Sequence, residues 1–203
     1  TYQKMSHWDF ISMESLLDQA EALLQNPSFP IEETRRSRLL GDVDLQRAFF
    51  FYWRGDIEAA LRLARQSLSV IPKEHGYAHT LAVLYTALAE ALSGRHDKAL
   101  QLLSKALIED CAEGSRNAGV FLVAQTGVDY YAGDLNAVEF TAKQILSVHK
   151  TVFVPDFWHA YAPYFLACSA YERNLLDTAA EHFGQVEQMR YVISTRLYQD
   201  ALM

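Results

Sequence analysis

The sequence is poor in the residues that interrupt regular structure. It has only 9 Gly and 5 Pro among 203 residues, too few for the many turns of a β-sandwich or barrel. Half of the residues are hydrophobic and 21% are charged, which is typical of a folded globular chain and argues against disorder. The composition therefore favours helices.

Cysteine and long apolar runs are also scarce. Cys111 and Cys168 lie far apart and form no CxxC motif, so the sequence predicts neither a disulfide framework nor a zinc site and fits a reducing cytoplasm. No run approaches 18 uncharged apolar residues, and the N-terminus lacks the pattern of a signal peptide. We therefore expect a cytoplasmic protein that has no membrane partner.

Basic residues are outnumbered by acidic ones. The chain carries 18 Lys and Arg against 25 Asp and Glu, a net charge of −7, and no basic stripe suited to phosphate backbones. It also contains no Gly-x-x-x-x-Gly-Lys-Ser/Thr phosphate loop and no closing basic recognition helix. We therefore expect no ATP hydrolysis and no direct nucleic-acid contact by this segment.

A repeat of about 39 residues dominates the sequence. Four turn residues each end one helical stretch just before the next begins, at intervals of 39, 39 and 41 residues: Gly55, Gly94, Gly133 and Asn174. Gly and Asn tolerate the left-handed backbone that ends many helices. Short side chains recur seven residues before and five residues after these turns: Ala48, Ala87, Thr126 and Ala167, then Ala60, Ala99, Val138 and Ala179. They predict close crossings between antiparallel helices.

The constant spacing favours a solenoid over a plain helical bundle, in which no period is fixed. We expect an all-α fold, a right-handed superhelical solenoid of antiparallel helix pairs forming a single domain over residues 1–203. The helix pairs are predicted at 31–72, 73–112, 113–152 and 153–190, after a partial repeat at 1–30 and before the start of a further helix at 191–203. Because the chain opens on Thr and closes just after an apolar-periodic stretch, we expect it to be excised from a longer polypeptide.

Three local predictions concern helix ends and faces. Residues 9–25 form an amphipathic pattern, with Leu16 among the residues on its apolar side. Pro30 followed by carboxylates predicts a helix that starts there and runs to about Trp53. Pro163 is expected inside the first helix of the last pair, where it would remove a backbone hydrogen bond and bend the helix.

The placement of Ala48, Gly55 and Ala60 resembles the tetratricopeptide repeat, whose period is a few residues shorter. The phrases Tyr-Trp-Arg-Gly-Asp-Ile-Glu-Ala-Ala-Leu at 52–61 and Tyr-Phe-Leu-Ala at 164–167, with the stretch that ends in Arg-Tyr at 190–191, are more specific. They are similar to the helical sensor region of MalT-like, LuxR-family transcriptional regulators. The resemblance spans roughly Leu39 to Tyr191.

This resemblance implies a non-catalytic region that binds a small-molecule effector or a protein partner. In such bacterial regulators an ATPase module precedes the helical region and a helix-turn-helix domain follows it. The alternative is a generic tetratricopeptide adaptor that binds a peptide segment of another protein, and self-association of the chain is a further option. An enzyme of unrecognised type is the second alternative.

Catalytic and metal-binding motifs were sought among the polar residues. His75 and His79 have the four-residue spacing of helical metal ligands, but His75 falls in a loop or first turn and no third ligand is near in sequence. No Gly-x-Ser-x-Gly nucleophile elbow occurs. We therefore expect no enzymatic activity, no cofactor and no metal.

Aromatic residues are abundant, with 11 Tyr, 11 Phe and 3 Trp. By resemblance to tetratricopeptide repeats, positions at fixed distances before each turn residue line a concave surface on the first helices. These positions give the candidate ligand- or partner-binding residues Phe49, Tyr52, Leu84, Tyr130, Tyr161, Tyr164 and Tyr171. A tyrosine suits this role because it combines a large apolar face with a hydroxyl group. The alternative is that these rings fill the space between helix layers.

Overall fold

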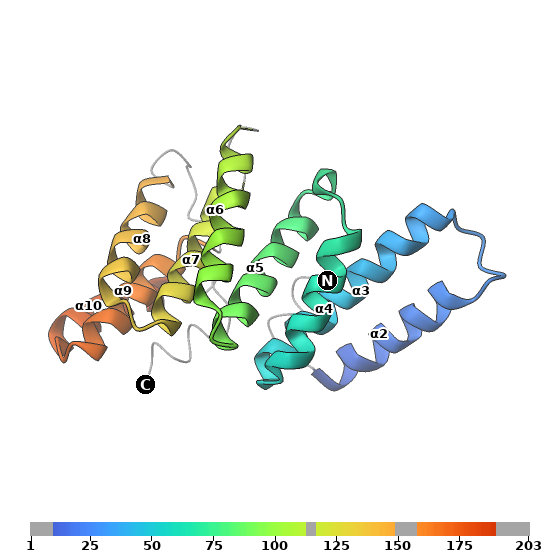
Figure 1. Ribbon diagram of the computed structural model, residues 1–203. Helices are drawn as coiled ribbons and strands as arrows, with labels where there is room; N and C mark the ends of the chain where they lie inside the picture. The colour runs from blue at the N-terminus through green and yellow to red at the C-terminus, as the bar shows by residue number, and fades with distance from the viewer. Residues whose placement is uncertain (1–9, 113–116, 149–157, 190–203) are drawn as a thin grey trace. The chain divides into compact units, whose positions relative to one another are not determined.

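The computed structural model describes residues 10–112, 117–148 and 158–189, and all regular elements in these ranges are helices (Figure 1). They are α2 (Phe10–Gln25), α3 (Glu33–Arg54), α4 (Ile57–Val70), the 3-10 turn η1 (Lys73–His75), α5 (Tyr77–Leu92), α6 (His96–Ala112), α7 (Ala118–Tyr131), α8 (Leu135–Val148), α9 (Tyr161–Glu172) and α10 (Leu176–Gln188). The all-α prediction is confirmed. None of the described helices is both long enough and apolar enough to cross a membrane. The further helix predicted at 191–203 lies outside the described residues.

The chain divides by its internal contacts into two compact units, residues 1–102 and 103–203, with the division inside α6. In the first unit α2 packs on α3, α3 on α4 and α4 on α5, and α3 also contacts α5. In the second unit α7 packs on α8, α8 on α9 and α9 on α10, and α7 also contacts α9. Both units therefore use one arrangement, in which a helix pair packs on the first helix of the next pair. The single domain over 1–203 stays a prediction.

The four turns share one backbone geometry, as their spacing predicts. The φ angles of Gly55, Gly94, Gly133 and Asn174 are 81°, 76°, 75° and 57°, all left-handed. In each turn the N–H of the following residue donates to the carbonyl oxygen of the residue four before the turn residue. These bonds join Asp56 to Phe51, Arg95 to Glu90, Asp134 to Asp129 and Leu175 to Ala170, at 2.9–3.0 Å. This bond satisfies a carbonyl group at the end of the helix, as in the Schellman motif.

The short side chains on both sides of the turns are buried, which confirms that they lie in helix contacts. All eight expose 3% or less of their surface. A third column of small residues, fourteen residues before each turn, is also buried and was not predicted: Gly41, Thr80, Gly119 and Ala160. A Cβ on Gly41 would lie 2.5 Å from Cγ2 of Val70, so a side chain at this position would require the side chain of Val70 to move.

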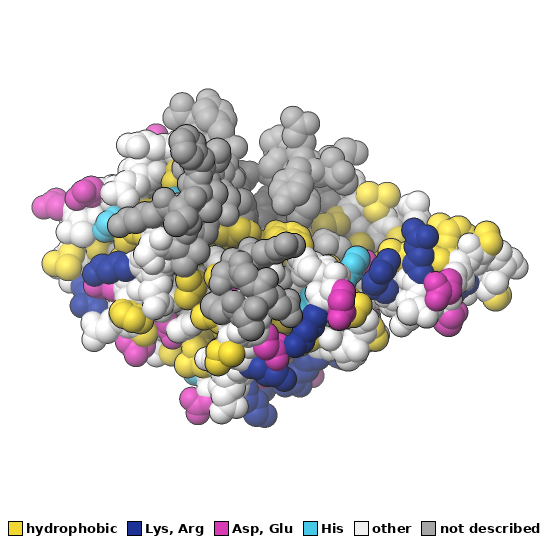
Figure 2. Space-filling view, turned by 90° about the horizontal axis from the view of Figure 1, so that it is seen from above, with side chains coloured by type: hydrophobic (Ala, Val, Ile, Leu, Met, Phe, Trp, Pro, Cys, Tyr) yellow, Lys and Arg dark blue, Asp and Glu magenta, His cyan; other side chains and the backbone are white. Residues whose placement is uncertain are grey.

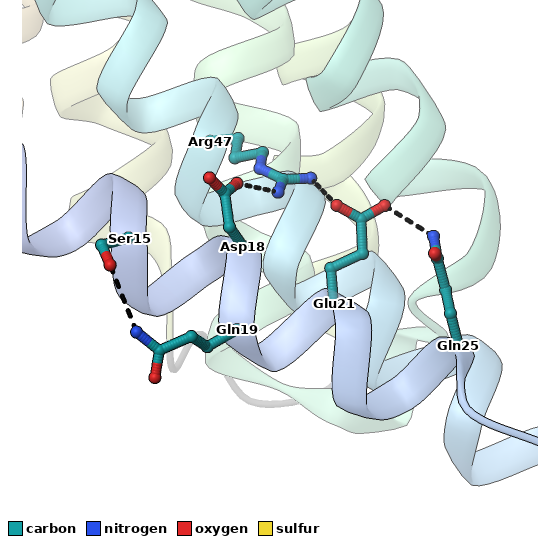
Figure 3. Close-up of polar contacts among 6 residues, drawn as sticks. All are labelled: Ser15, Asp18, Gln19, Glu21, Gln25 and Arg47. Atoms are coloured by element: carbon teal, nitrogen blue, oxygen red, sulfur yellow. Dashed lines mark hydrogen bonds and ion pairs between the residues drawn. The ribbon is translucent and has the colours of Figure 1, made fainter.

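The N-terminal helix α2 is held to α3 by an arginine bridge. Arg47 of α3 contacts Asp18 at 2.7 Å and Glu21 at 2.5 Å, both on α2 (Figure 3). Leu24 is buried, but Leu16, predicted on the apolar side, is 60% exposed. Among the described helices α2 packs mainly on α3, which covers only part of the apolar side of α2 and leaves Leu16 exposed.

Two predictions about proline have different outcomes. The helix after Pro30 is confirmed as α3, which begins at Glu33 and ends at Arg54. The bend at Pro163 is wrong, because α9 begins at Tyr161 and Pro163 is its third residue. A first-turn residue has no intrahelical acceptor for its N–H group, so proline removes no hydrogen bond there.

The packing predicts a large loss of stability at one alanine of α10 and almost none at the next. Ala179 is 3% exposed at a helix contact, whereas Ala180 is exposed. Ala179→Leu should lower the free energy of unfolding by about 1–3 kcal/mol, because added volume displaces the neighbouring helix. Ala180→Leu, the matched control, should change it by less than about 0.5 kcal/mol. Urea denaturation measures both, and equal losses would show that the crossing is not where the repeat puts it.

Candidate functional site

Aromatic rings of the second unit form one connected cluster. Phe165 of α9 lies at its centre, with ring centroids 6.1 Å from Tyr130, 6.3 Å from Tyr161 and 5.5 Å from Tyr164. Tyr161 is stacked on Trp158 at 5.8 Å, and Tyr164 contacts Phe183 of α10 at 6.4 Å. We call these rings the C-terminal ring cluster: Tyr130, Trp158, Tyr161, Tyr164, Phe165 and Phe183. They bring α7, α9 and α10 together through their side chains.

A second ring cluster lies in the first unit. Phe49 and Tyr52 of α3 both contact Tyr85 of α5, with ring centroids 5.6 Å and 5.7 Å apart. Trp53 contacts Phe49 at 6.5 Å and Tyr52 at 5.3 Å. We call these rings the N-terminal ring cluster. They join the first helices of successive pairs, as Tyr130 and Phe165 do in the second unit.

The seven predicted binding residues separate into four groups. Tyr130, Tyr161 and Tyr164 are half-buried in the C-terminal ring cluster. Phe49 and Tyr52 belong to the N-terminal ring cluster, where Tyr52 is buried. Leu84 is 3% exposed, so it offers almost no surface to a ligand, and Tyr171 is 62% exposed and outside both clusters. Their role in binding stays a prediction.

The sequence-based offsets missed several members of these clusters. Phe165 is adjacent to Tyr164 and is buried, so an offset chosen for outward positions passes over it. Trp158 precedes α9, and Phe183 lies on the second helix of the pair. The offsets from the turn residues therefore could not have predicted that Trp158 and Phe183 belong to the cluster. For Trp158 and Phe165, the signal that could have drawn attention to them is the high aromatic content of residues 153–165.

Tyr130 also links the cluster to a carboxylate at the end of α9. Its hydroxyl donates a hydrogen bond to Oε1 of Glu172 at 3.3 Å. Burial, the nearby Cys168 and Glu172 together raise the pKa of Tyr130 to about 12. The hydroxyl therefore keeps its proton at neutral pH and remains a hydrogen-bond donor.

Two buried acids occupy the same repeat position, four residues before a turn residue. Glu90 and Asp129 are both 5% exposed. Burial alone would raise the pKa of Glu90, but hydrogen bonds from Arg95 and Arg65 outweigh it and hold this pKa below its usual value. These two arginines contact Glu90 from the turn and from α4. The first acid is therefore a satisfied, charged contact.

The second acid has no such cation among the described residues. Where Arg95 follows the turn residue Gly94, Asp134 follows Gly133. Burial is the main cause that raises the pKa of Asp129, and the charge of Asp134 adds a smaller increase. A hydrogen bond from Thr141, at 3.3 Å, only partly opposes them, so the pKa of Asp129 is raised to about 6. Sequence reasoning missed this contrast, although the equal spacing of the two acids could have revealed it. Asp129 is an acid that titrates near neutral pH.

The two histidines with metal-ligand spacing have separate partners. His75 lies 3.3 Å from Asp42 through Nε2, and His79 contacts the carbonyl oxygen of Ile71 through Nδ1 at 2.9 Å. Within the described ranges, no three or more His, Cys, Asp or Glu side chains are grouped as metal ligands would be.

On the face shown in Figure 2, basic and acidic side chains are interspersed.

Comparison of the chain with protein-family models, curated proteins and solved structures found no match. The similarity to MalT-like regulators rests on the sequence phrases quoted above and stays a prediction. The features of this chain that bear on its function are therefore its ring clusters and its charged groups.

The raised pKa of Asp129 predicts a pH-dependent stability. Between about pH 4 and pH 6 the folded protein binds more protons than the unfolded chain, whose Asp pKa lies near 3.8. The free energy of unfolding should therefore fall as the pH rises through this range. Asp129→Asn should remove this dependence and stabilise the protein at pH 7 by about 1–3 kcal/mol. Urea denaturation at several pH values measures the effect.

The matched control is the acid at the same position of the preceding repeat. Glu90→Gln should destabilise the protein at pH 7, by about 1–3 kcal/mol, because it weakens the hydrogen bonds from Arg65 and Arg95. Destabilisation by both substitutions would show that Asp129 is as well satisfied as Glu90.

Proposed function

We propose that this chain is a non-catalytic helical-repeat module that binds a small effector or a partner through aromatic side chains of its first helices. We further propose that it is the sensing region of a bacterial, MalT-like transcriptional regulator of the LuxR family. The observation that carries the proposal is the C-terminal ring cluster, in which rings from three helices meet and all except Phe165 remain partly exposed.

The repeated turns support a solenoid architecture for this module. Each pair packs on the first helix of the next within its unit, and the turn geometry is the same four times. Continued in both directions, such stacking produces a tetratricopeptide-like right-handed superhelix, in which each repeat contacts only its neighbours. First helices then line one side, and these are the helices that carry most of the clustered rings.

Binding would act through the helices that share the cluster. Tyr130 lies on α7 and Tyr161 and Tyr164 lie on α9, so a ligand that touches these rings contacts two successive pairs. A ligand that prefers one relative tilt of the pairs shifts the population toward it, by no more than its difference in affinity for the two states. In a full-length regulator this shift would bias the change between inactive and active forms.

An adaptor that binds a peptide or protein is the second candidate. Three apolar side chains around the α9–α10 turn are exposed: Tyr171 by 62%, Leu175 by 53% and Leu176 by 56%. Neighbouring exposed apolar residues favour a protein contact over a small ligand. The two candidates share the fold and differ in the ligand.

Ligand binding and stability can be separated at the cluster. We expect a panel of sugars, amines, nucleosides and extended peptides to contain a compound that raises the melting temperature of the chain. The double variant Tyr130→Leu and Tyr161→Leu keeps apolar volume against the core but loses two ring faces. It should bind that compound at least about tenfold more weakly, since aromatic contacts supply about 1–2 kcal/mol each. Isothermal titration calorimetry measures the affinity.

Phe140→Leu is the matched control, because Phe140 is a 65% exposed ring of the same unit outside the cluster. The Phe140→Leu variant should bind the compound found in the panel with the same affinity as the unsubstituted chain. Tyr171→Ala should keep the melting temperature and weaken only peptide binding, which distinguishes the adaptor from the effector sensor. A large loss of stability with unchanged affinity in the double variant would show that the rings serve the core alone.

A further inference from the structure

We propose that the ligand of the C-terminal ring cluster carries a positively charged alkylammonium group. This group binds where α7 and α9 end, against Tyr130, Tyr131 and Glu172. The inference rests on the proposed function and names the chemistry of its ligand. Three observations support it: a carboxylate where the other pairs have apolar side chains, the lack of a cation for it among the described residues, and the rings beside it.

The repeat itself marks Glu172 as an exception. Two residues before the turn residue, the four pairs place Trp53, Leu92, Tyr131 and Glu172. One residue earlier they place Tyr52, Ala91, Tyr130 and Tyr171, all uncharged. The fourth pair therefore puts a carboxylate where the other pairs put apolar or aromatic side chains. This position is exposed in three of the four pairs, so a carboxylate there is accessible to a ligand.

The described part of the chain supplies no cation for this carboxylate. From α7 to α10 the described Lys and Arg residues are Lys143 and Arg173, and both contact Glu139, at 3.9 Å and 3.4 Å. Glu172 is exposed and, among the described residues, accepts only the hydrogen bond from Tyr130. Its negative charge is therefore available to a ligand.

The surrounding field favours a cation. The ends of α7 and α9 come together at the contact between Tyr130 and Glu172, and each helix end carries a partial negative charge. Residues 103–203 contain 12 acidic and 7 basic residues, a net charge of −5, so most of the chain's charge of −7 falls on this unit. Such a field raises the local concentration of cations and repels anions.

The neighbouring rings supply the remaining contact. The ring centroids of Tyr130 and Tyr131 lie 6.3 Å apart, and Tyr131 is 39% exposed. The face of an aromatic ring attracts an alkylammonium or guanidinium group within about 6 Å. The first unit contains an internal example, because the guanidinium of Arg54 lies 5.0 Å over the ring of Phe50. Rings combined with a carboxylate are therefore suited to an organic cation.

The test compares choline with its uncharged isostere, in which a tert-butyl group replaces the trimethylammonium group. Ligand-observed NMR titrations of the chain should give an affinity for choline about tenfold higher than for the isostere. Glu172→Gln should reduce the affinity for choline about fivefold or more and leave the isostere unchanged. Because Glu172 is exposed, circular dichroism should show an unaltered fold.

Asp177→Asn is the control for net charge, since Asp177 is an exposed acid five residues further along the chain. It should not change the affinity for choline; an equal loss in both variants would overturn the site. Equal binding of choline and isostere would overturn the cation preference but leave the proposed effector site intact. If a neutral compound of the panel binds at the ring cluster and choline does not, the cation preference is likewise wrong and the proposed effector site is kept. If nothing binds the cluster, both this inference and the effector-binding proposal are wrong.

Discussion

The left-handed residue that ends the first helix of each pair is the constraint on which the rest of the structure depends. At Gly55, Gly94, Gly133 and Asn174 the chain reverses with the same hydrogen bond from the next residue back to the last turn of the helix. A helix end fixed in this way sets the register of the two helices that follow one another. The same sequence offsets therefore bring side chains to the helix crossing each time, and only short side chains fit there.

A fixed register also means that the pairs differ mainly through the side chains that occupy the same repeat position. Glu90 and Asp129 are equally buried, yet one is held by two arginines and the other faces a second acid. Local backbone geometry is nearly the same at both places, so the contrast comes from which side chains neighbouring elements contribute. Glu172 is the corresponding case on the surface, where a carboxylate replaces an apolar side chain beside Tyr130.

The aromatic clusters contribute to packing and, in the proposed function, also bind the ligand. Tyr130, Tyr161 and Tyr164 lie against the buried core of the second unit and remain partly exposed, so a ligand on their outer faces would act on side chains that also hold the helices together. Stiff rings lose little conformational freedom on binding, which suits them to such a double role. A ligand at these rings could therefore influence how neighbouring pairs pack.

Much of the fold was predictable from the sequence, because helical periodicity and turn chemistry are local properties. The all-α class, the four turns, the buried small residues and the helix after Pro30 were determined in this way. The resemblance to tetratricopeptide repeats selected three tyrosines that lie in one cluster, Tyr130, Tyr161 and Tyr164. The sequence could not show that Leu84 is buried, that Leu16 is exposed, or that Pro163 falls in a first turn. Nor could it identify the ring partners of Tyr130 and Tyr161, or the pKa of Asp129. These features depend on residues far apart in the chain that meet only when helices pack, and burial and charge are set by those neighbours.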